Sequence, residues 1–204
     1  MRPLLQIGNL INLQDARSSA AVGFDMINFS LAKGDPRKLS VSLVWNIIQW
    51  LSGPEVVLEI NAESQDELKE ATAQFPIHFA AIPYADRQAV DFSLAPAWIL
   101  RGFHPESPAA VEAALAEIQA LDRPVYLELS LETALEALAY EAYFPDLFLH
   151  FEEMREATTF VQLKKEAVKG LSFYDEAEEE FGQLHYENID DFLEVFFDQY
   201  ERDP

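Results

Sequence analysis

The chain has 204 residues, half of them hydrophobic, which suits one large domain with a single core. It contains no cysteine, which excludes disulfides, thiol nucleophiles and thiolate metal sites. Its formal net charge of −22 argues against nucleic acid and anionic membrane lipids as partners, because both are bound through basic patches.

The acidity itself has two interpretations. It is typical of a highly soluble protein or of a salt-tolerant proteome, and it is also compatible with an acidic face that docks a basic partner. No basic-then-apolar leader and no apolar run of about 18 residues is visible, so we expect a cytoplasmic protein without a membrane span.

Short apolar runs bounded by Gly, Pro or Asp recur along the whole chain and predict buried parallel strands. In chain order, the predicted strands are Pro3–Gly8, Phe24–Ser30, Glu55–Asn61, Ile77–Ile82, Ala97–Phe103, Val125–Ser130, Asp146–Phe151 and Lys169–Tyr174.

The intervening segments predict helices, whose starts are marked by capping residues. The predicted caps are Asn12, Ser40, Ser107 and Ser130. The seventh helix is expected over about Glu152–Lys165 and the last from about Ile189. The fourth is the weakest, since Tyr84–Ala95 has room for one helical turn at best.

Eight strand–helix units in regular order predict an α/β fold, a single (β/α)8 TIM barrel over residues 1–204 with a short or irregular fourth helix. The alternative is an open doubly wound sheet. No Gly-x-Gly-x-x-Gly pattern follows the first strand, which disfavours the open sheet.

Four segments near the N-terminus carry a more specific pattern: Gln6-Ile7-Gly8, Asn12–Ala16, Gly23–Asp25 and Asp35–Ser40. In order and spacing they resemble the phosphoribosylanthranilate isomerase family, barrel enzymes of tryptophan biosynthesis. Gly170–Ser172 and the last helix resemble the family's final unit more loosely. The resemblance implies a TIM barrel and an aldose-to-ketose isomerisation.

The departures from the family pattern concern the catalytic residues. In the family, a cysteine on strand one is the general base and an aspartate at the end of strand six is the general acid. Gly8 stands at the cysteine position and Gln6 at the position of a lysine. The aspartate has no clear match, since Leu129 aligns with it and Glu128 does so after a shift of one residue.

The family's phosphate is held by glycine-rich loops after strands seven and eight, where backbone N–H groups approach the ligand. This chain has only seven glycines, and the corresponding loops read Phe151–Arg155 and Asp175–Glu180. Both carry acidic residues, so we expect them to repel a phosphate.

Residues of a barrel strand alternate between the interior and the helices. If the purely apolar positions face the helices, a polar set lines the interior: Gln6, Asn28, Ser30, Glu59, Asn61, Arg101, Tyr126, Glu128, His150, Ser172 and Tyr174. Catalytic groups of such barrels lie at the carboxyl ends of the strands.

Two interpretations of this lining remain open. In the first it is structural, with Arg101 paired between Glu59 and Glu128, because buried charges need partners. In the second it is a pocket, in which Arg101 binds a carboxylate while Glu128 and His150 serve as acid and base. Gln6, Asn28 and Glu59 then complete the substrate site.

Arg37 matches an arginine that contacts the anthranilate part of the family's substrate. Its presence favours a small anionic or aromatic ligand, and the alternative is a solvated turn. The four histidines are far apart in the sequence, so we expect no histidine-based metal site, and we predict neither a metal nor a cofactor.

Three functions follow. The first is a divergent isomerase-like barrel without isomerase activity, which binds a small anion or a protein. The second is an active aldose-ketose isomerase in which Glu128 transfers the proton. The third is an acidic scaffolding protein that docks a basic partner through Asp175–Glu180.

Overall fold

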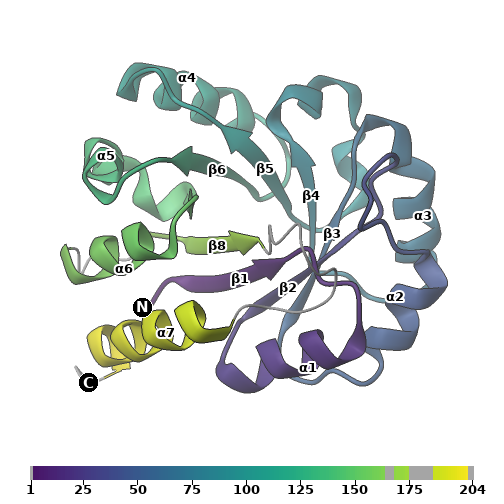
Figure 1. Ribbon diagram of the computed structural model, residues 1–204. Helices are drawn as coiled ribbons and strands as arrows, with labels where there is room; N and C mark the ends of the chain where they lie inside the picture. The colour runs from purple at the N-terminus through teal and green to yellow at the C-terminus, as the bar shows by residue number, and fades with distance from the viewer. Residues whose placement is uncertain (1, 164–167, 175–185, 202–204) are drawn as a thin grey trace.

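The computed structural model describes residues 2–163, 168–174 and 186–201, which form a closed barrel of parallel strands (Figure 1). Each strand pairs with the next along the chain, and the last pairs with the first. The strands are Leu4–Gly8 (β1), Met26–Ser30 (β2), Glu55–Glu59 (β3), Phe79–Pro83 (β4), Trp98–Phe103 (β5), Val125–Leu131 (β6), Leu147–Phe151 (β7) and Gly170–Tyr174 (β8). The predicted (β/α)8 barrel is confirmed, and the open sheet is excluded.

Helices surround the barrel (Figure 1). The α-helices are Leu13–Val22 (α1), Val41–Ile48 (α2), Gln65–Gln74 (α3), Pro108–Gln119 (α4), Ala134–Ala137 (α5), Met154–Leu163 (α6) and Tyr186–Glu201 (α7). The 3₁₀ segments are Ala62–Ser64 (η1), Tyr84–Ala89 (η2), Phe92–Leu94 (η3) and Leu138–Asp146 (η4). The fourth unit contains only η2 and η3 between its strands, which confirms the predicted irregular helix.

Three of the four predicted caps are confirmed. Asn12 Oδ1 accepts a hydrogen bond from the Asp15 N–H at 2.9 Å, and Ser40 and Ser107 cap α2 and α4 in the same way. The Ser130 cap is wrong, because β6 continues to Leu131 and α5 is capped by Thr133 instead. Ser130 therefore remains on the strand, where its side chain lines the mouth of the barrel.

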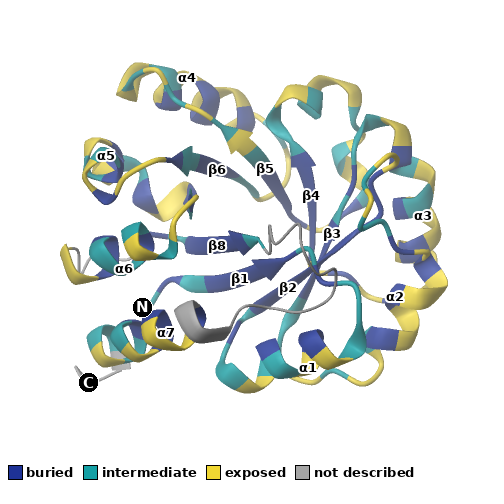
Figure 2. Ribbon diagram, viewed as in Figure 1, coloured by how far each residue is buried: buried dark blue, intermediate teal, exposed yellow. Residues whose placement is uncertain are grey.

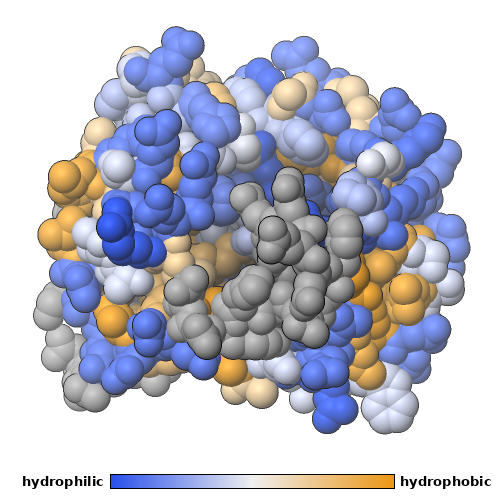
Figure 3. Space-filling model, in the orientation of Figure 1, coloured by the Kyte–Doolittle hydropathy of each residue, from blue (hydrophilic) through white to orange (hydrophobic). Residues whose placement is uncertain are grey.

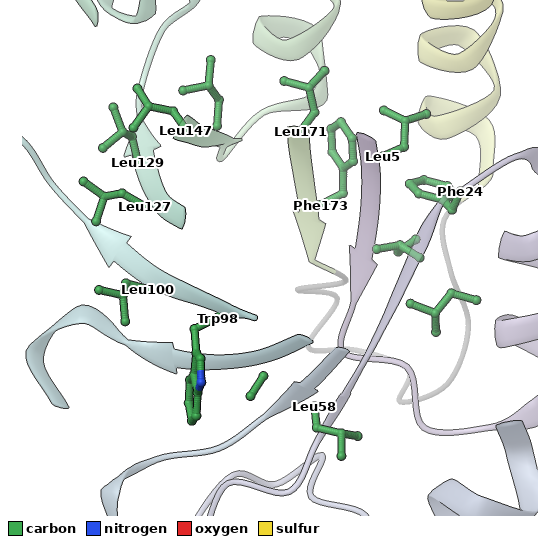
Figure 4. Close-up of a cluster of buried hydrophobic side chains, with 14 of the residues drawn as sticks. Leu5, Phe24, Leu58, Trp98, Leu100, Leu127, Leu129, Leu147, Leu171 and Phe173 are labelled. Carbon is green, nitrogen blue, oxygen red and sulfur yellow. The ribbon is translucent and has the colours of Figure 1, made fainter. Parts of the chain in front are cut away.

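The main core lies between the barrel and its helices (Figure 2). Figure 4 shows outward strand residues that supply it, among them Leu5, Leu100, Leu127 and Leu171. Trp98, at the start of β5, packs against η3 of the fourth unit. Its indole N–H donates to the Phe92 carbonyl at 2.9 Å, and the two rings pack edge to face. This contact anchors η3 where other units have a helix.

Inside the barrel, the layer near the amino ends of the strands is apolar. It consists of Met26, Val57, Phe79, Ala81, Ala97, Ile99 and Phe148. Polar residues follow toward the carboxyl ends, so the predicted alternation is correct while the polar lining occupies one end only. The interior is therefore apolar near the amino ends of the strands and polar near their carboxyl ends.

Outside the barrel, the described surface is mainly hydrophilic on the face shown in Figure 3, with apolar groups in separate patches. None of the described helices combines the length and the apolar character that a bilayer crossing requires.

Candidate functional site at the mouth of the barrel

An open cavity of about 400 Å³ lies at the carboxyl ends of the strands, where barrels of this architecture place their sites. It is lined by Glu59, Pro83, Arg101, Gly102, His104, Glu128, Ser130, His150, Glu152 and Tyr174. Four predicted site residues thus meet here: Glu59, Arg101, Glu128 and His150. Gln6 and Asn28 are fully buried inside the barrel and are not part of the cavity wall.

A β-bulge in β5 marks the position of Arg101. Leu100 pairs with Leu127, while Phe103 pairs with Leu129, so β5 has one residue more than β6 over this stretch. Gly102 adopts φ +70°, a left-handed conformation that favours glycine. The bulge lies at the cavity wall, where such irregularities commonly redirect side chains.

Arg101 is paired with both interior glutamates. Its guanidinium forms an ion pair with Glu59, and its Nε lies 3.5 Å from Glu128 Oε1. The guanidinium also stacks on the ring of Tyr174, with 3.7 Å between Cζ and the ring centroid. Burial opposes its charge, but Tyr174 and the two carboxylates outweigh burial and raise the pKa of Arg101. The pairing expected by the structural interpretation is therefore present.

Within this group, the carboxylate of Glu59 has an unfavourable electrostatic environment. Burial raises the pKa of its carboxyl group, and the nearby charges of Glu128 and Asp35 add to that effect. The guanidinium of Arg101 and a 3.4 Å hydrogen bond from Asn28 Nδ2 act in the opposite direction without cancelling it. An additional positive charge near Glu59 would relieve this unfavourable environment.

Tyr174, at the end of β8, connects the remaining groups. Its hydroxyl donates to Glu128 Oε2 at 2.5 Å and accepts from Gln6 Nε2 at 3.3 Å. Burial, foremost, raises the pKa of Tyr174 well above its ordinary value, so the phenol keeps its proton and remains a donor. Sequence reasoning placed Tyr174 in the lining but assigned it no role, although its inward position at a strand end was visible.

The ring of Tyr174 also fills the space beside Gly8. A Cβ atom at position 8 would lie 2.6 Å from Tyr174 Cε1 and closer still to Cδ1, nearer than carbon atoms approach without bonding. The absence of a side chain at Gly8 and the position of Tyr174 are thus two parts of one packing arrangement.

His150 has a defined tautomer. Its Nδ1 lies 3.0 Å from the backbone carbonyl of Ser172, which can only accept, so Nδ1 carries the hydrogen. In the neutral ring Nε2 is then a hydrogen-bond acceptor. The imidazole packs edge to face on Tyr174, with 5.0 Å between ring centroids. Among the described residues, no hydrogen bond or ion pair joins His150 directly to Glu128.

Some cavity residues were not predicted, and a third predicted residue, after Gln6 and Asn28, lies outside the cavity wall. His104, which lines the cavity, directly follows the predicted strand Ala97–Phe103. Its position at the carboxyl end of a strand could have identified it as a site residue. Arg37, which is half-buried in the loop after β2, is not among the residues of the cavity wall. The acid run Asp175–Glu180 lies outside the described residues.

Four buried polar atoms in or near the cavity wall have no hydrogen-bond partner among the described residues: Gln6 Oε1, Asn28 Oδ1, Arg101 Nε and Ser172 Oγ. No group of three or more His, Asp or Glu side chains within the described ranges is arranged to hold a metal ion.

Solved structures with a similar architecture include several phosphoribosylanthranilate isomerases. Phosphoribosylanthranilate isomerases from Thermus thermophilus and Pyrococcus furiosus superpose with TM-scores of 0.66 and 0.68, at 20% and 12% sequence identity. The superpositions cover 98% of this chain and 98% and 99% of theirs. A third, solved in complex with reduced 1-(o-carboxyphenylamino)-1-deoxyribulose 5-phosphate, gives 0.67 at 16% identity, with 98% of both chains covered.

Neither a protein-family model nor a curated protein sequence matches the chain significantly. At identities of 20% or less, the structural matches establish the architecture and leave the chemistry to the residues of the mouth. This chain therefore has, over nearly its whole length, the fold of the phosphoribosylanthranilate isomerases.

Proposed function

We propose that this barrel no longer performs the isomerase reaction of its structural neighbours and that it binds a small molecule at its mouth. The first half of the proposal rests mainly on position 8. The family resemblance puts a catalytic cysteine there, whereas this chain has Gly8 and a tyrosine ring in the space that any side chain would need.

Glu128, the carboxylate that could replace the missing base, is already engaged. Glu128 accepts from the Tyr174 hydroxyl and lies against Arg101, and its side chain is 2% exposed. A carboxylate held by a donor and a cation is a weaker base than a free one. Arg101 in turn has two carboxylates as partners, which leaves little of its charge for a substrate phosphate or carboxylate.

The second half rests on the cavity. Its walls come from six neighbouring strands or the loops that follow them, and they combine imidazoles, carboxylates, a hydroxyl and a phenol. A concave site with a few convergent polar groups is where small molecules bind in folds of this kind. A cytoplasmic location, expected from the sequence, stays a prediction.

An isomerase assay with phosphoribosylanthranilate tests the loss of activity. We expect no turnover above the uncatalysed rate, with an isomerase of known activity as the positive control. The variant E128Q tests the alternative, an active isomerase in which Glu128 transfers the proton. In that case the wild type turns over the substrate and the turnover rate of E128Q is about 10²–10⁴-fold lower. Turnover by the wild type would overturn the proposal.

A further inference from the structure

The charges around the mouth cavity are unbalanced. Among the described residues of its wall, the carboxylates of Glu59, Glu128 and Glu152 face the guanidinium of Arg101, so these four side chains carry a net charge of −2 when ionised. Asp35 lies close enough to influence Glu59 and adds to the negative side. The cavity is therefore electrostatically suited to a positive ligand.

Arg101, whose guanidinium is the one present in the described part of the cavity wall, cannot reverse this sign, because its charge is already shared. Arg101 pairs with Glu59 and Glu128, and the face of the Tyr174 ring lies against it. A carboxylate or phosphate entering the cavity would have to compete with two glutamates for Arg101. It would also meet Glu152 at the rim, which is exposed and forms no ion pair with any described residue.

A second, independent feature is the acceptor of His150. Because Nδ1 donates to the Ser172 carbonyl, the neutral ring offers Nε2 as a lone pair at the cavity wall. The lone pair of His150 Nε2 and the carboxylate of Glu152 can both accept hydrogen bonds from a positively charged ligand that has N–H donors.

We propose that the mouth cavity binds a small organic cation, a protonated amine whose N–H groups donate to Glu152 and to His150 Nε2. This inference rests on the proposed function, since it names the ligand class of that binding site. A cavity of about 400 Å³ suits an organic molecule rather than a bare metal ion, and no metal-binding group is present within the described residues.

Three probes with the same four-carbon chain test the ligand class: putrescine, butane-1,4-diol and succinate, a dication, a neutral molecule and a dianion. Binding is measured by isothermal titration calorimetry at neutral pH and equal ionic strength. We expect putrescine to bind and the other two to show no binding. Binding of the diol or of succinate as tight as that of putrescine, or no binding of any probe, would overturn the proposal.

Matched variants separate the cavity from the general attraction of a highly acidic surface. E152Q removes a charge from the cavity wall, and E112Q removes one from the exposed face of α4. We expect E152Q to weaken putrescine binding about two- to fivefold, the range of a partly exposed charge pair, and E112Q to leave it unchanged. Equal effects of both variants would show that binding is non-specific.

The two proposals fail in different ways. Isomerase turnover by the wild type would end the proposed loss of activity, whichever probe binds. Selective binding of succinate or the diol with an inactive enzyme would leave the binding barrel intact and refute the cationic ligand alone.

Discussion

At the scale of single residues, Tyr174 determines what the mouth of the barrel can do. Its hydroxyl occupies one oxygen of Glu128, its ring face supports Arg101, and its edge fills the space next to Gly8. One aromatic side chain thus engages a candidate base, packs against the arginine that could bind an anion and occupies the space that a side chain at position 8 would need. The absence of a side chain at position 8 and the packing of Tyr174 in the interior are physically coupled.

This coupling predicts the effect of a methyl group at position 8. We expect G8A to lower the free energy of unfolding by about 1–3 kcal/mol, because the added Cβ overlaps the Tyr174 ring and forces it to move. In a Y174S background the ring is absent, so the same substitution becomes nearly neutral. Urea unfolding of the four proteins gives the coupling energy directly.

The variant Y174F provides the matched control for that cycle. It keeps the ring and removes only the hydroxyl, so G8A should remain costly in its background. If G8A costs the same beside tyrosine, phenylalanine and serine, the ring is not what excludes a side chain from position 8.

The raised pKa of Glu59 predicts a specific pH dependence. A carboxyl group whose pKa is higher in the folded state contributes stability below its ordinary pKa of 4.5, and this contribution is lost as pH rises through the folded value. The wild type should therefore lose more stability than E59Q between pH 4.5 and neutrality. Urea unfolding across that range measures the difference.

Glu67 supplies a control of opposite sign. The hydrogen bond from Lys38 lowers the pKa of Glu67, so its contribution is present above the ordinary value and is lost as pH falls. E67Q should therefore reduce the loss of stability on acidification. Parallel pH profiles for wild type and E59Q would contradict the assignment for Glu59.

At the scale of elements, the sequence predicted strands and helix caps correctly wherever the local residue pattern alone determines them. Buried strands are recognisable because both their faces are apolar or enclosed, and every predicted strand lies within two residues of the observed one. The Ser130 cap failed because a serine at the end of a strand also suits a barrel interior, and the true cap lies three residues later. Local pattern cannot decide between these two environments.

The confirmed cap of α1 is a test of how much a single local interaction contributes. N12A removes the acceptor for the Asp15 N–H and should lower the free energy of unfolding by about 1 kcal/mol. N12S keeps a side-chain oxygen at the same place and should retain most of the stability. Chemical denaturation of both variants checks this, and equal losses for alanine and serine would exclude capping as the cause.

At the scale of the whole molecule, the architecture was predictable and the contacts of the site were not. Strand alternation correctly placed Glu59, Arg101, Glu128 and His150 on the interior. It could not show that Arg101 pairs with both glutamates or that Tyr174 binds Glu128, because those contacts depend on side-chain torsions across the barrel. The same limit applies to the space beside Gly8, which is filled from β8, more than 160 residues further along the chain.

The net charge of −22 affects the stability of the entire barrel. With 36 acidic and 14 basic side chains, the folded state concentrates like charges that the unfolded chain spreads out, so repulsion destabilises the fold. Sodium chloride at 0.1 M screens charges that are more than a Debye length of about 10 Å apart. Added salt should therefore raise the midpoint of urea unfolding at pH 7.5. At pH 5, nearer the isoelectric point of about 4.3, fewer net charges remain and the same salt should have a smaller effect. A midpoint that falls with added salt would show that favourable ion pairs outweigh the repulsion, and an equal rise at both pH values would show that the salt does not act by screening the net charge.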